Sequence, residues 1–502
     1  MFTTRSCAKL CSKLGKSLGL RKVHVLPDFT QNSYNVRRGN YSVLQDSHID
    51  FFQEIVGEER VIMDETDLNR YNIDWYNQVR GKSKIVIKPK TTEEVSQILS
   101  FCNDQRLAVC PQGGNTCVSG GSVPVFDEIV LSSDLMNKII SLDETSGVLV
   151  CQAGCILENL NNFVADKKLL LPLDLGSKGS CHIGGNVSTN AGGLRLLRYG
   201  SLHGSVLGLE IVKADGEVLD CLSTLKKDNT GYHLHHLFIG SEGTLGFVTK
   251  VAIHCPPQSK AISLAFLGAP SYENVLKTFK RAKNELGEIL SAVEVIDTPS
   301  MDTLNDHLQI TPPIGKHEFY LLLETKGSDE EHDQQKLNKF LESVLSENLI
   351  SDGAIASEPG KYHAMWAIRE RLPEAFLHDG YVYNYDLTIP LEYYFKLVAD
   401  VRQHVGTEAT RVFGFGHLGD GNIHLQVSTK EFNKAMKKRI DTFLFNKVKE
   451  LNGSISAEHG MGFLKAGYLS SIKNESSFKL MKSLKALMDP NGILNPYKVL
   501  EN

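Results

Sequence analysis

Directly after an apolar run, Leu107-Ala-Val-Cys110, the chain reads Pro111-Gln-Gly-Gly-Asn-Thr-Cys-Val-Ser-Gly-Gly121. The apolar run predicts a buried strand, and the glycines after it predict a tight loop. Backbone without Cβ atoms can point successive N–H groups at one place, which suits the oxygens of a phosphate or pyrophosphate. An ordinary glycine-rich surface loop has the same composition. This segment alone therefore leaves both interpretations open.

The loop lies at the end of a predicted βαβ unit. A strand at 85–87 precedes a helix that begins at Thr91, where Glu94 completes a capping box. Apolar residues at helical spacing line one face of this helix: Val95, Ile98, Leu99 and Cys102. Ligands of α/β sheets bind beyond the carboxyl ends of the strands. The sequence therefore predicts a ligand site at the loop.

Two further segments are rich in small residues. The longer one reads Gly176-Ser-Lys-Gly-Ser-Cys-His-Ile-Gly-Gly-Asn-Val-Ser-Thr-Asn-Ala-Gly-Gly193, and it is almost free of charge. Such composition is unusual for a solvated linker, so we expect an irregular segment that lies flat against a large planar ligand. The shorter one, Gly240–Gly246, predicts a turn before a strand at 247–253.

Composition limits the class of protein. The 502 residues, of which 41% are hydrophobic and 23% charged, are typical of a soluble protein of two or three domains. A net charge of -5 gives no reason to expect nucleic acid as a partner, and no apolar run is long enough to span a membrane. Ten cysteines are too few for a disulfide scaffold. A reducing compartment fits.

The first 27 residues contain six basic residues and no acidic one, which is typical of a mitochondrial transit peptide, although a basic tail would look the same. We expect residues 1–40 to be transit peptide or disordered. Residues 41–80, where Asp and Asn interrupt any long helix, are expected to be a lead-in segment that packs on the next domain. The next domain is expected to end near Pro256-Pro257.

From residue 262 onward, strands and long helices alternate. Helices are predicted at 271–286, 330–348, 361–378, 391–405, 430–451 and 474–488. This order predicts an α+β domain with an antiparallel sheet and helices on one face.

The segment His417-Leu-Gly-Asp-Gly-Asn-Ile-His424 predicts a metal site. If Asp420-Gly421 forms a two-residue hairpin turn, the two histidines face each other about 5 Å apart between Cβ atoms. Glu458, at the end of a strand expected from Ser454, would add a carboxylate. Two histidines and one carboxylate form a catalytic metal site, with Zn²⁺ the preferred ion. A facing histidine pair without metal is the alternative.

A second histidine cluster has less support. His233, His235 and His236 are spaced to lie on different sides of a helical turn, and no carboxylate or cysteine accompanies them. We expect them to lie at a surface or a helix end.

Six segments together resemble the FAD-linked D-2-hydroxyacid dehydrogenases, flavoproteins of the vanillyl-alcohol-oxidase (PCMH) type. The resemblance runs from about residue 50 to the end. The segments are Pro111–Thr116, Ile183–Gly193, Gly240–Gly246, His417–His424, Ala457–Gly462 and Asp489–Pro496. It implies a PCMH-type FAD-binding domain of two α/β subdomains at 81–258 and a C-terminal substrate and metal domain at 259–502.

The resemblance also implies which residues bind FAD. Relatives with covalent flavin carry a histidine where this chain has Asn115 and Thr116, so non-covalent FAD is expected. The implied cofactor residues are Pro111, Gln112, Gly113, Gly114, Asn115, Thr116, Ser177, Cys181, Gly184, Gly185, Asn186, Thr189, Asn190, Gly192, Glu242, Gly243 and Asn495.

The activity implied is oxidation of D-2-hydroxyglutarate to 2-oxoglutarate in the mitochondrial matrix, with electron-transfer flavoprotein as acceptor. A metal on His417, His424 and Glu458 would bind the substrate hydroxyl, and His459 would be the base. Arg369 resembles the family's carboxylate-binding arginine, although a surface helix arginine is its ordinary interpretation. A homodimer stays possible.

Three positions depart from the family's hydroxyglutarate enzymes. Those enzymes carry Lys, Thr and Asn where this chain has Asn384, Pro373 and Gln426. Asn384 and Gln426 can still donate hydrogen bonds to the substrate. Asn384 lacks the positive charge of the Lys that stands there in those enzymes. Two alternatives therefore stay open: a D-lactate or glycolate dehydrogenase of the same fold, and a flavin-binding relative without turnover.

Overall fold

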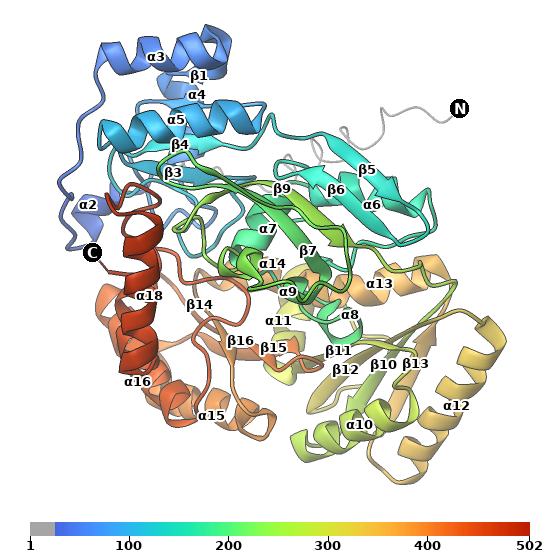
Figure 1. Cartoon of the computed structure of the whole chain (residues 1–502). Helices are drawn as coiled ribbons and strands as arrows, with labels where there is room; N and C mark the ends of the chain where they lie inside the picture. Colours follow the sequence, from blue (N-terminus) through green and yellow to red (C-terminus); the bar gives the residue numbers. More distant parts are fainter. Residues whose placement is uncertain (1–25, 502) are drawn as a thin grey trace.

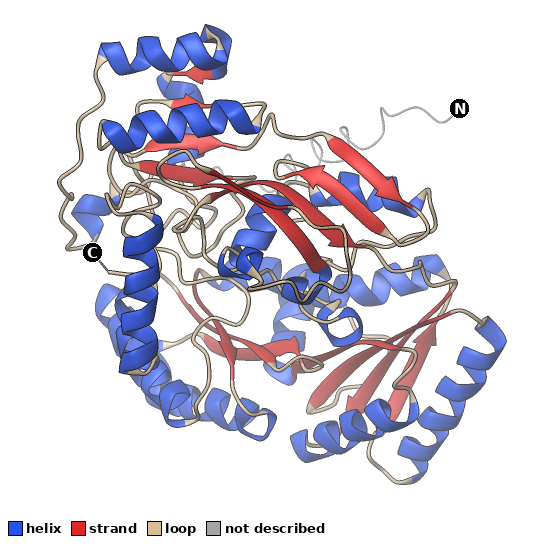
Figure 2. Ribbon diagram, in the orientation of Figure 1, coloured by secondary structure: helices blue, strands red, loops and turns tan. Residues whose placement is uncertain are grey.

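The structure, a computed structural model, describes residues 26–501, which form three β-sheets (Figure 1). The two smaller sheets come from the N-terminal half, and the seven-stranded sheet comes from the C-terminal half. Figure 2 shows the two smaller sheets together above the large one. This arrangement confirms the predicted α+β class with an antiparallel C-terminal sheet.

The first sheet carries the glycine-rich loop. Its order is β1 (Val61–Ile62), β2 (Val86–Ile87), β4 (Ile129–Ser132), β3 (Val109–Gln112). β2, β4 and β3 run parallel, and α5 (Thr92–Asp104) crosses from β2 to β3. The four apolar residues predicted for one face of α5 are all 0% exposed. The Thr91 hydroxyl accepts from the N–H of Glu94 at 3.2 Å, as predicted.

The second sheet is antiparallel. Its order is β5 (Ile139–Asp143), β6 (Val148–Gln152), β9 (Phe247–His254), β7 (Val206–Val212), β8 (Val218–Cys221). Helices α6 (Leu157–Ala165), α7 (Ile183–Thr189) and α9 (Leu202–Ser205) pack on it, whereas α8 (Leu196–Tyr199) packs on the C-terminal sheet. The dipeptide Asp215-Gly216, typical of a hairpin turn, joins β7 to β8, with Gly216 at φ 85°.

Helix α7 contradicts the prediction that residues 176–193 are irregular. Its composition is poor for a helix, but the hydroxyls of Ser188 and Thr189 donate to the carbonyls of Gly184 and Gly185 one turn earlier. Short polar side chains therefore turn back onto the helix. These side chains therefore stay close to the helix backbone.

The seven-stranded sheet is antiparallel throughout. Its order is β13 (Asp352–Ala356), β10 (Ala261–Ala269), β12 (Phe319–Gly327), β11 (Leu290–Asp297), β15 (Arg411–His417), β16 (Asn422–Thr429), β14 (Tyr381–Thr388). One face packs on α10 (Tyr272–Glu285), α12 (Glu330–Ser346), α15 (Tyr394–Val405) and α16 (Lys434–Glu450). The other face packs on α11 (Thr298–Leu308), α13 (Pro359–Glu370) and α14 (Leu372–Phe376). Helices thus cover both faces, so the prediction of one covered face is wrong.

Two details of this half also differ from expectation. The helix predicted at 361–378 is divided into α13 and α14, because Pro373 has no N–H to continue the hydrogen-bond ladder. α11 and β13 were not predicted.

Short 3₁₀ turns complete the described chain: η1 (Glu58–Arg60), η2 (Leu234–Leu237), η3 (Leu377–Asp379), η4 (Leu391–Tyr393), η5 (Gly406–Glu408) and η6 (Ala466–Tyr468).

The lead-in segment is more helical than expected. It forms α3 (Asp46–Val56) and α4 (Glu65–Asn72), so the expectation that no long helix occurs there is wrong. α3 packs on α5, where the rings of Phe51 and Phe101 stack with centroids 3.8 Å apart. Capping interactions between Gln45 and His48 stabilise the start of α3, where helix breaks were expected.

Part of the segment predicted as transit peptide or disordered belongs to the fold. It includes α2 (Thr30–Ser33), and Thr30 is 1% exposed. The N–H of Thr30 donates to the carbonyl of Arg80 at 2.8 Å. The boundary at residue 40 is therefore wrong. The basic segment itself, residues 1–25, lies outside the described residues.

The end of the chain returns to the first sheet. After α17 (Leu469–Ile472) and α18 (Glu475–Met488), the N–H of Val109 donates to the carbonyl of Ile493, and the N–H of Asn495 donates to the carbonyl of Val109. Figure 1 shows this red segment reaching the blue and cyan part. Within residues 26–501, no helix has the length and apolar composition to cross a membrane.

Replacing Phe52 by Ala tests whether the lead-in segment contributes to stability. Phe52 is 0% exposed between α3 and α5. We expect a loss of about 3–5 kcal/mol, which for a chain of 502 residues corresponds to a fall in Tm of roughly 3–5 °C. Thermal denaturation followed by circular dichroism measures it. The control is Phe163→Ala at a site 36% exposed, which should change Tm little; equal Tm values for the two variants would contradict the role given to α3.

Candidate active site

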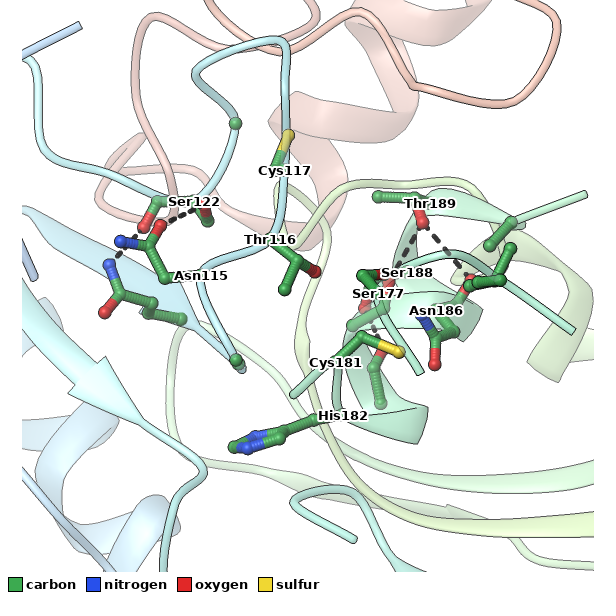
Figure 3. A pocket seen from close by; sticks show the side chains of 18 of the residues that line it. Asn115, Thr116, Cys117, Ser122, Ser177, Cys181, His182, Asn186, Ser188 and Thr189 are labelled. Carbon is green, nitrogen blue, oxygen red and sulfur yellow. Dashed lines mark hydrogen bonds between the residues drawn. The ribbon is translucent and has the colours of Figure 1, made fainter. Parts of the chain in front are cut away.

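A cavity of about 720 Å³ lies where the two halves of the chain meet. Its walls are the glycine-rich loop after β3, the segment around α7, and the turn at Glu242-Gly243. Four residues of the C-terminal half complete it: Glu370, Pro373, Glu458 and His459. Figure 3 shows Asn115, Thr116 and Cys117 on one side and the residues around α7 on the other.

Most of the predicted cofactor residues line this cavity. They are Pro111, Gln112, Gly113, Gly114, Asn115, Thr116, Ser177, Cys181, Gly184, Gly185, Asn186, Thr189, Glu242 and Gly243. Asn190, Gly192 and Asn495 do not line it. Asn190 ends α7 in the left-handed conformation, and Gly192 lies against Glu458. The Asn495 amide donates to the carbonyls of Gly121 and Glu242, so it holds two wall segments together.

The glycines allow the two loops to touch. A methyl group on Gly114 would lie 1.9 Å from the carbonyl oxygen of Ser180, and one on Gly184 would lie 2.5 Å from the Cβ of Ala153. The amide of Gln112 donates to the carbonyls of Tyr71 and Ser122. Polar side chains thus fix the loop shape and leave backbone facing the cavity.

The cavity fits a large polar ligand in one further respect. The Oδ1 atom of Asn186, on α7, is buried and has no hydrogen-bond partner within the described chain. Buried polar atoms are almost always paired. Its position in the wall indicates that a bound molecule supplies the partner, as the flavin of an FAD would.

Three imidazoles converge on one oxygen at the edge of this cavity. The Nε2 atoms of His417, His424 and His459 lie 3.6, 3.8 and 3.9 Å from Oε1 of Glu458. These distances are too long for hydrogen bonds, but each atom could reach an ion placed about 2.0–2.2 Å away. The donor set therefore fits a divalent transition metal.

Ligand atoms of Asp386, His424, Glu458 and His459 all lie within 4.8 Å of one another. His417 is outside this group, although it was predicted as a ligand together with His424 and Glu458. The structure thus brings His424 and Glu458 together with Asp386 and His459, and His417 adjoins this group through its Nε2 atom, 3.6 Å from Oε1 of Glu458.

Glu294, on β11, orients two of the predicted residues. One carboxylate oxygen accepts from Nδ1 of His417 at 2.6 Å, and the other accepts from Nε of Arg369 at 2.6 Å. This leaves Nε2 of His417 facing Glu458, as an outer carboxylate does for a metal-binding histidine. Burial raises the pKa of Glu294, but the charges of His417 and Arg369 outweigh it, so the pKa lies below its ordinary value.

Asp386, on β14, holds the loop that carries Glu458 and His459. One oxygen accepts the N–H groups of both residues at 2.9 Å. The same oxygen lies 3.7 Å from Nδ1 of His459. Burial raises the pKa of Asp386, yet the imidazole of His459 and nearby cations keep it below its ordinary value.

The same loop is held from the other half of the chain. The carboxylate of Glu242 accepts the N–H groups of Met461 and Gly462, each at 2.7 Å. The Ser119 hydroxyl donates to the carbonyls of His459 and Gly460. Residues of both halves therefore fix Glu458 and His459 in space.

The protonation states of two of the three predicted ligands suit a metal site. Burial lowers the pKa of His424 to about 3. Burial raises the pKa of Glu458, but the neighbouring imidazoles hold it well below its ordinary value. A neutral imidazole and an ionised carboxylate are the forms in which these groups bind metals. The third is His417, where burial lowers the pKa but the carboxylates of Glu294 and Glu458 outweigh it and raise the pKa above its ordinary value.

The predicted hairpin register is wrong. His424 pairs with Phe415 rather than with His417, and His417 pairs with Glu294 on β11. The connection is longer than two residues because pairing with β11 holds His417 beyond the β15–β16 ladder. Both histidines still lie on one face, since a shift of two residues keeps the face. Their ring centroids are 5.2 Å apart.

One other local prediction is corrected, and three predicted side chains lie outside the cavity. Residues 454–459 form no strand; only Ser454 bridges to Thr388, and Glu458 follows in a loop. The three side chains predicted to bind substrate, Arg369, Asn384 and Gln426, do not line the cavity. Arg369 lies over the ring of Phe415 at 4.6 Å, and Gln426 donates to Asn384 at 3.1 Å.

Sequence reasoning missed Glu294 and Asp386. A signal existed for Glu294, because the strand Leu290-Ser-Ala-Val-Glu-Val-Ile-Asp297 is otherwise mostly apolar and a buried acid needs partners. Asp386 follows two tyrosines and Asn384 in a strand of alternating pattern, which does not single it out.

The histidine cluster at 233–236 lies at the surface and at a short helical turn, as predicted, but the directions of its side chains differ from expectation. One ligand atom from each of His233, His235 and His236 lies within 4.8 Å of the others, although they were predicted to point to different sides. The 3₁₀ turn η2 has three residues per turn rather than 3.6, which changes the directions of the side chains. Burial, and then the neighbouring imidazoles, lower the pKa of His235 to about 4.

Replacing Gly114 by Ala tests the loop contact. The added methyl group would push the glycine-rich loop away from Ser180, at a cost of about 1–3 kcal/mol, and weaken flavin binding about 5- to 150-fold. The flavin absorbance per protein after gel filtration measures it. The control is Gly360→Ala, where a methyl group meets no atom within 4 Å; full flavin retention by Gly114→Ala would show that the contact is unimportant.

Comparison with known proteins agrees with the fold. The model of the FAD binding domain matches residues 83–222, and the model of the C-terminal domain of FAD linked oxidases matches residues 258–499. A solved structure of p-cresol methylhydroxylase with bound substrate has TM-score 0.74 at 16% identity, covering 92% of this chain and 98% of that one. At this identity the likeness shows the fold alone.

Relatives with higher identity cover nearly the whole chain. A mitochondrial D-2-hydroxyglutarate dehydrogenase of Danio rerio is 52% identical over 92% of this chain and 86% of its own length. A D-2-hydroxyglutarate–pyruvate transhydrogenase of Saccharomyces cerevisiae is 41% identical over 95% of this chain and 99% of its own. The matching models and these relatives confirm the resemblance, and the chain belongs to the FAD-linked oxidase family of PCMH-type flavoproteins.

Proposed function

We propose that this chain oxidises D-2-hydroxyglutarate to 2-oxoglutarate, with non-covalently bound FAD and a divalent metal, Zn²⁺ by its ligand set. One observation carries the proposal: three imidazole nitrogens and a carboxylate converge at the edge of the cavity that the cofactor residues line. Glu458 and His459 belong to both the convergence and the cavity wall. One alcohol could therefore contact both sites.

The two groups have separate tasks. A metal held by His417, His424 and Glu458 would lower the pKa of the substrate hydroxyl, and FAD in the cavity would accept the C2 hydride. Residues of the chain itself hold the metal ligands in position. Asp386 and Glu242 fix the loop of Glu458, and Glu294 fixes His417.

His459 is proposed as the base. It takes the proton of the substrate hydroxyl at a ring nitrogen. Its side chain is partly open to the cavity, with 25% of the side chain exposed. Asp386, near its Nδ1 atom, orients the ring and stabilises the imidazolium that forms.

Arg369 is proposed to bind the substrate's carboxylate. Glu294 occupies its Nε–H, and no hydrogen bond to its two terminal nitrogens is found within residues 26–501. Those nitrogens suit a bidentate carboxylate. The ring of Phe415 beneath the guanidinium holds its plane in place.

The substrate assignment comes from the relatives and has one competitor. Asn384 and Gln426 form a neutral pair, where a distal carboxylate would favour a cation. The name of the yeast relative includes pyruvate, the 2-oxo acid that corresponds to D-lactate. D-lactate or glycolate is therefore the second candidate substrate, and a flavin-binding relative without turnover is the third alternative.

The cellular location and the electron acceptor are also inferred from the relatives. Those from animals and plants are named as mitochondrial, and the basic residues at the N-terminus suit import. We propose the matrix as the location and electron-transfer flavoprotein as the acceptor, both as the family implies. A homodimer is compatible with the fold.

A substrate panel tests the activity. FAD-loaded protein of measured metal content is mixed anaerobically with D-2-hydroxyglutarate, D-lactate or glycolate, and flavin bleaching is followed by absorbance. At limiting concentration, D-2-hydroxyglutarate should bleach the flavin fastest. Arg369 and the metal would bind its hydroxyacid end, and its longer chain would add contacts that the smaller acids lack. Faster bleaching by D-lactate or glycolate would favour the smaller substrate. No bleaching by any of them would support loss of turnover.

Replacing His459 by Ala tests the base. Flavin and metal content should stay at wild-type levels, whereas bleaching by substrate should fall about 10²- to 10⁴-fold. Stopped-flow absorbance and metal analysis of the same sample measure both. The control is His363→Ala on the exposed side of α13. Wild-type bleaching in His459→Ala would exclude this histidine as the base.

A further inference from the structure

Four histidines from two segments form a cluster away from the active site. His203 belongs to α9, and His233, His235 and His236 belong to η2 or precede it. The ring centroids of His203 and His236 are 4.1 Å apart, and those of His235 and His236 are 4.2 Å apart. His233 completes the cluster at 5.4 Å from His236.

The four rings have only one another as close partners. No side-chain hydrogen bond or ion pair of these histidines is found within residues 26–501, whereas other histidines such as His307 and His417 pair with carboxylates. The ring nitrogens are therefore free of hydrogen bonds to the described chain and can serve as metal ligands.

We propose that His233, His235 and His236, with His203 beside them, form a second metal site that binds one divalent transition metal ion. Neither the matched families nor the proposed oxidation requires it. One ligand nitrogen from each of the first three histidines lies within 4.8 Å of the other two. Side-chain rotations that bring these nitrogens to about 3.4 Å from one another let all three bind one tetrahedral ion about 2.0–2.1 Å away.

The ligand chemistry selects the class of metal. Imidazole nitrogens suit Zn²⁺, Ni²⁺ and Cu²⁺, whereas Mg²⁺ and Ca²⁺ prefer oxygen. His235 and His236 are half-buried and anchor the site, and exposed His233 leaves the ion accessible from solvent. His203 or water takes the fourth position of a tetrahedral Zn²⁺.

The site is connected to the wall of the flavin cavity. The N–H of His203 donates to Oδ1 of Asn190, which ends α7. After η2, the N–H of Gly240 donates to the carbonyl of Val187 in the same helix. An ion that joins α9 to η2 therefore clamps the two segments that hold α7. Metal binding should raise the Tm of the FAD-loaded protein.

Counting metal equivalents tests the proposal. FAD-loaded full-length protein is stripped with a chelator, dialysed against a small excess of Zn²⁺ at micromolar concentration, and analysed by elemental analysis. The triple variant His233→Ala/His235→Ala/His236→Ala should hold one equivalent less than wild type. The double variant His417→Ala/Glu458→Gln should keep that equivalent. This result would hold even if the active site bound no metal, so the two proposals fail separately.

Spectroscopy identifies the ligands. With Cu²⁺ as the probe in the double variant, nitrogen couplings should appear in the electron paramagnetic resonance spectrum and vanish when the three histidines are also replaced. Circular dichroism and flavin absorbance show whether each variant is folded. The control, His332→Ala/His363→Ala, removes two exposed histidines elsewhere and should keep every equivalent. An unchanged count in the triple variant, or occupancy only at millimolar metal, would overturn the proposal.

Discussion

The active site depends on hydrogen bonding to a half-buried loop that has no secondary structure of its own. Backbone N–H groups without a ladder partner must find acceptors, or they cost free energy. In residues 458–462, Asp386 accepts two of them and Glu242 accepts two more. These two acids come from opposite halves of the chain. Glu458 and His459 therefore have their positions only when both halves are packed together.

The large sheet supplies the rest of the site through simple alternation. On β16, Ile423, Leu425 and Val427 enter the core, so His424 and Gln426 face the other way. Glu294 and His417 share that face on neighbouring strands. The facing histidines could be predicted because alternation along two strands of a hairpin can be read from sequence, and the loops could be predicted from their glycines and from the family resemblance.

The features that could not be predicted from sequence depend on contacts between distant segments. The Asp420-Gly421 turn suggested one register, but pairing of His417 with Glu294, far back in the sequence, imposed another. Helix α7 forms from residues of poor propensity because the surrounding strands and loops enclose it. The cluster around His235 depends on a 3₁₀ turn and on His203 in another element. No local pattern encodes such meetings.

The pairing of residues 493–495 with β3 has a consequence for how the protein is made. The strand that leads into the glycine-rich loop has β4 on one side and gains its other neighbour only from residues 493–495, which are remote in sequence. While the ribosome still holds those residues, the first sheet is unfinished on that side. Flavin capture should therefore wait until residues 493–495 have been synthesised and have docked on β3.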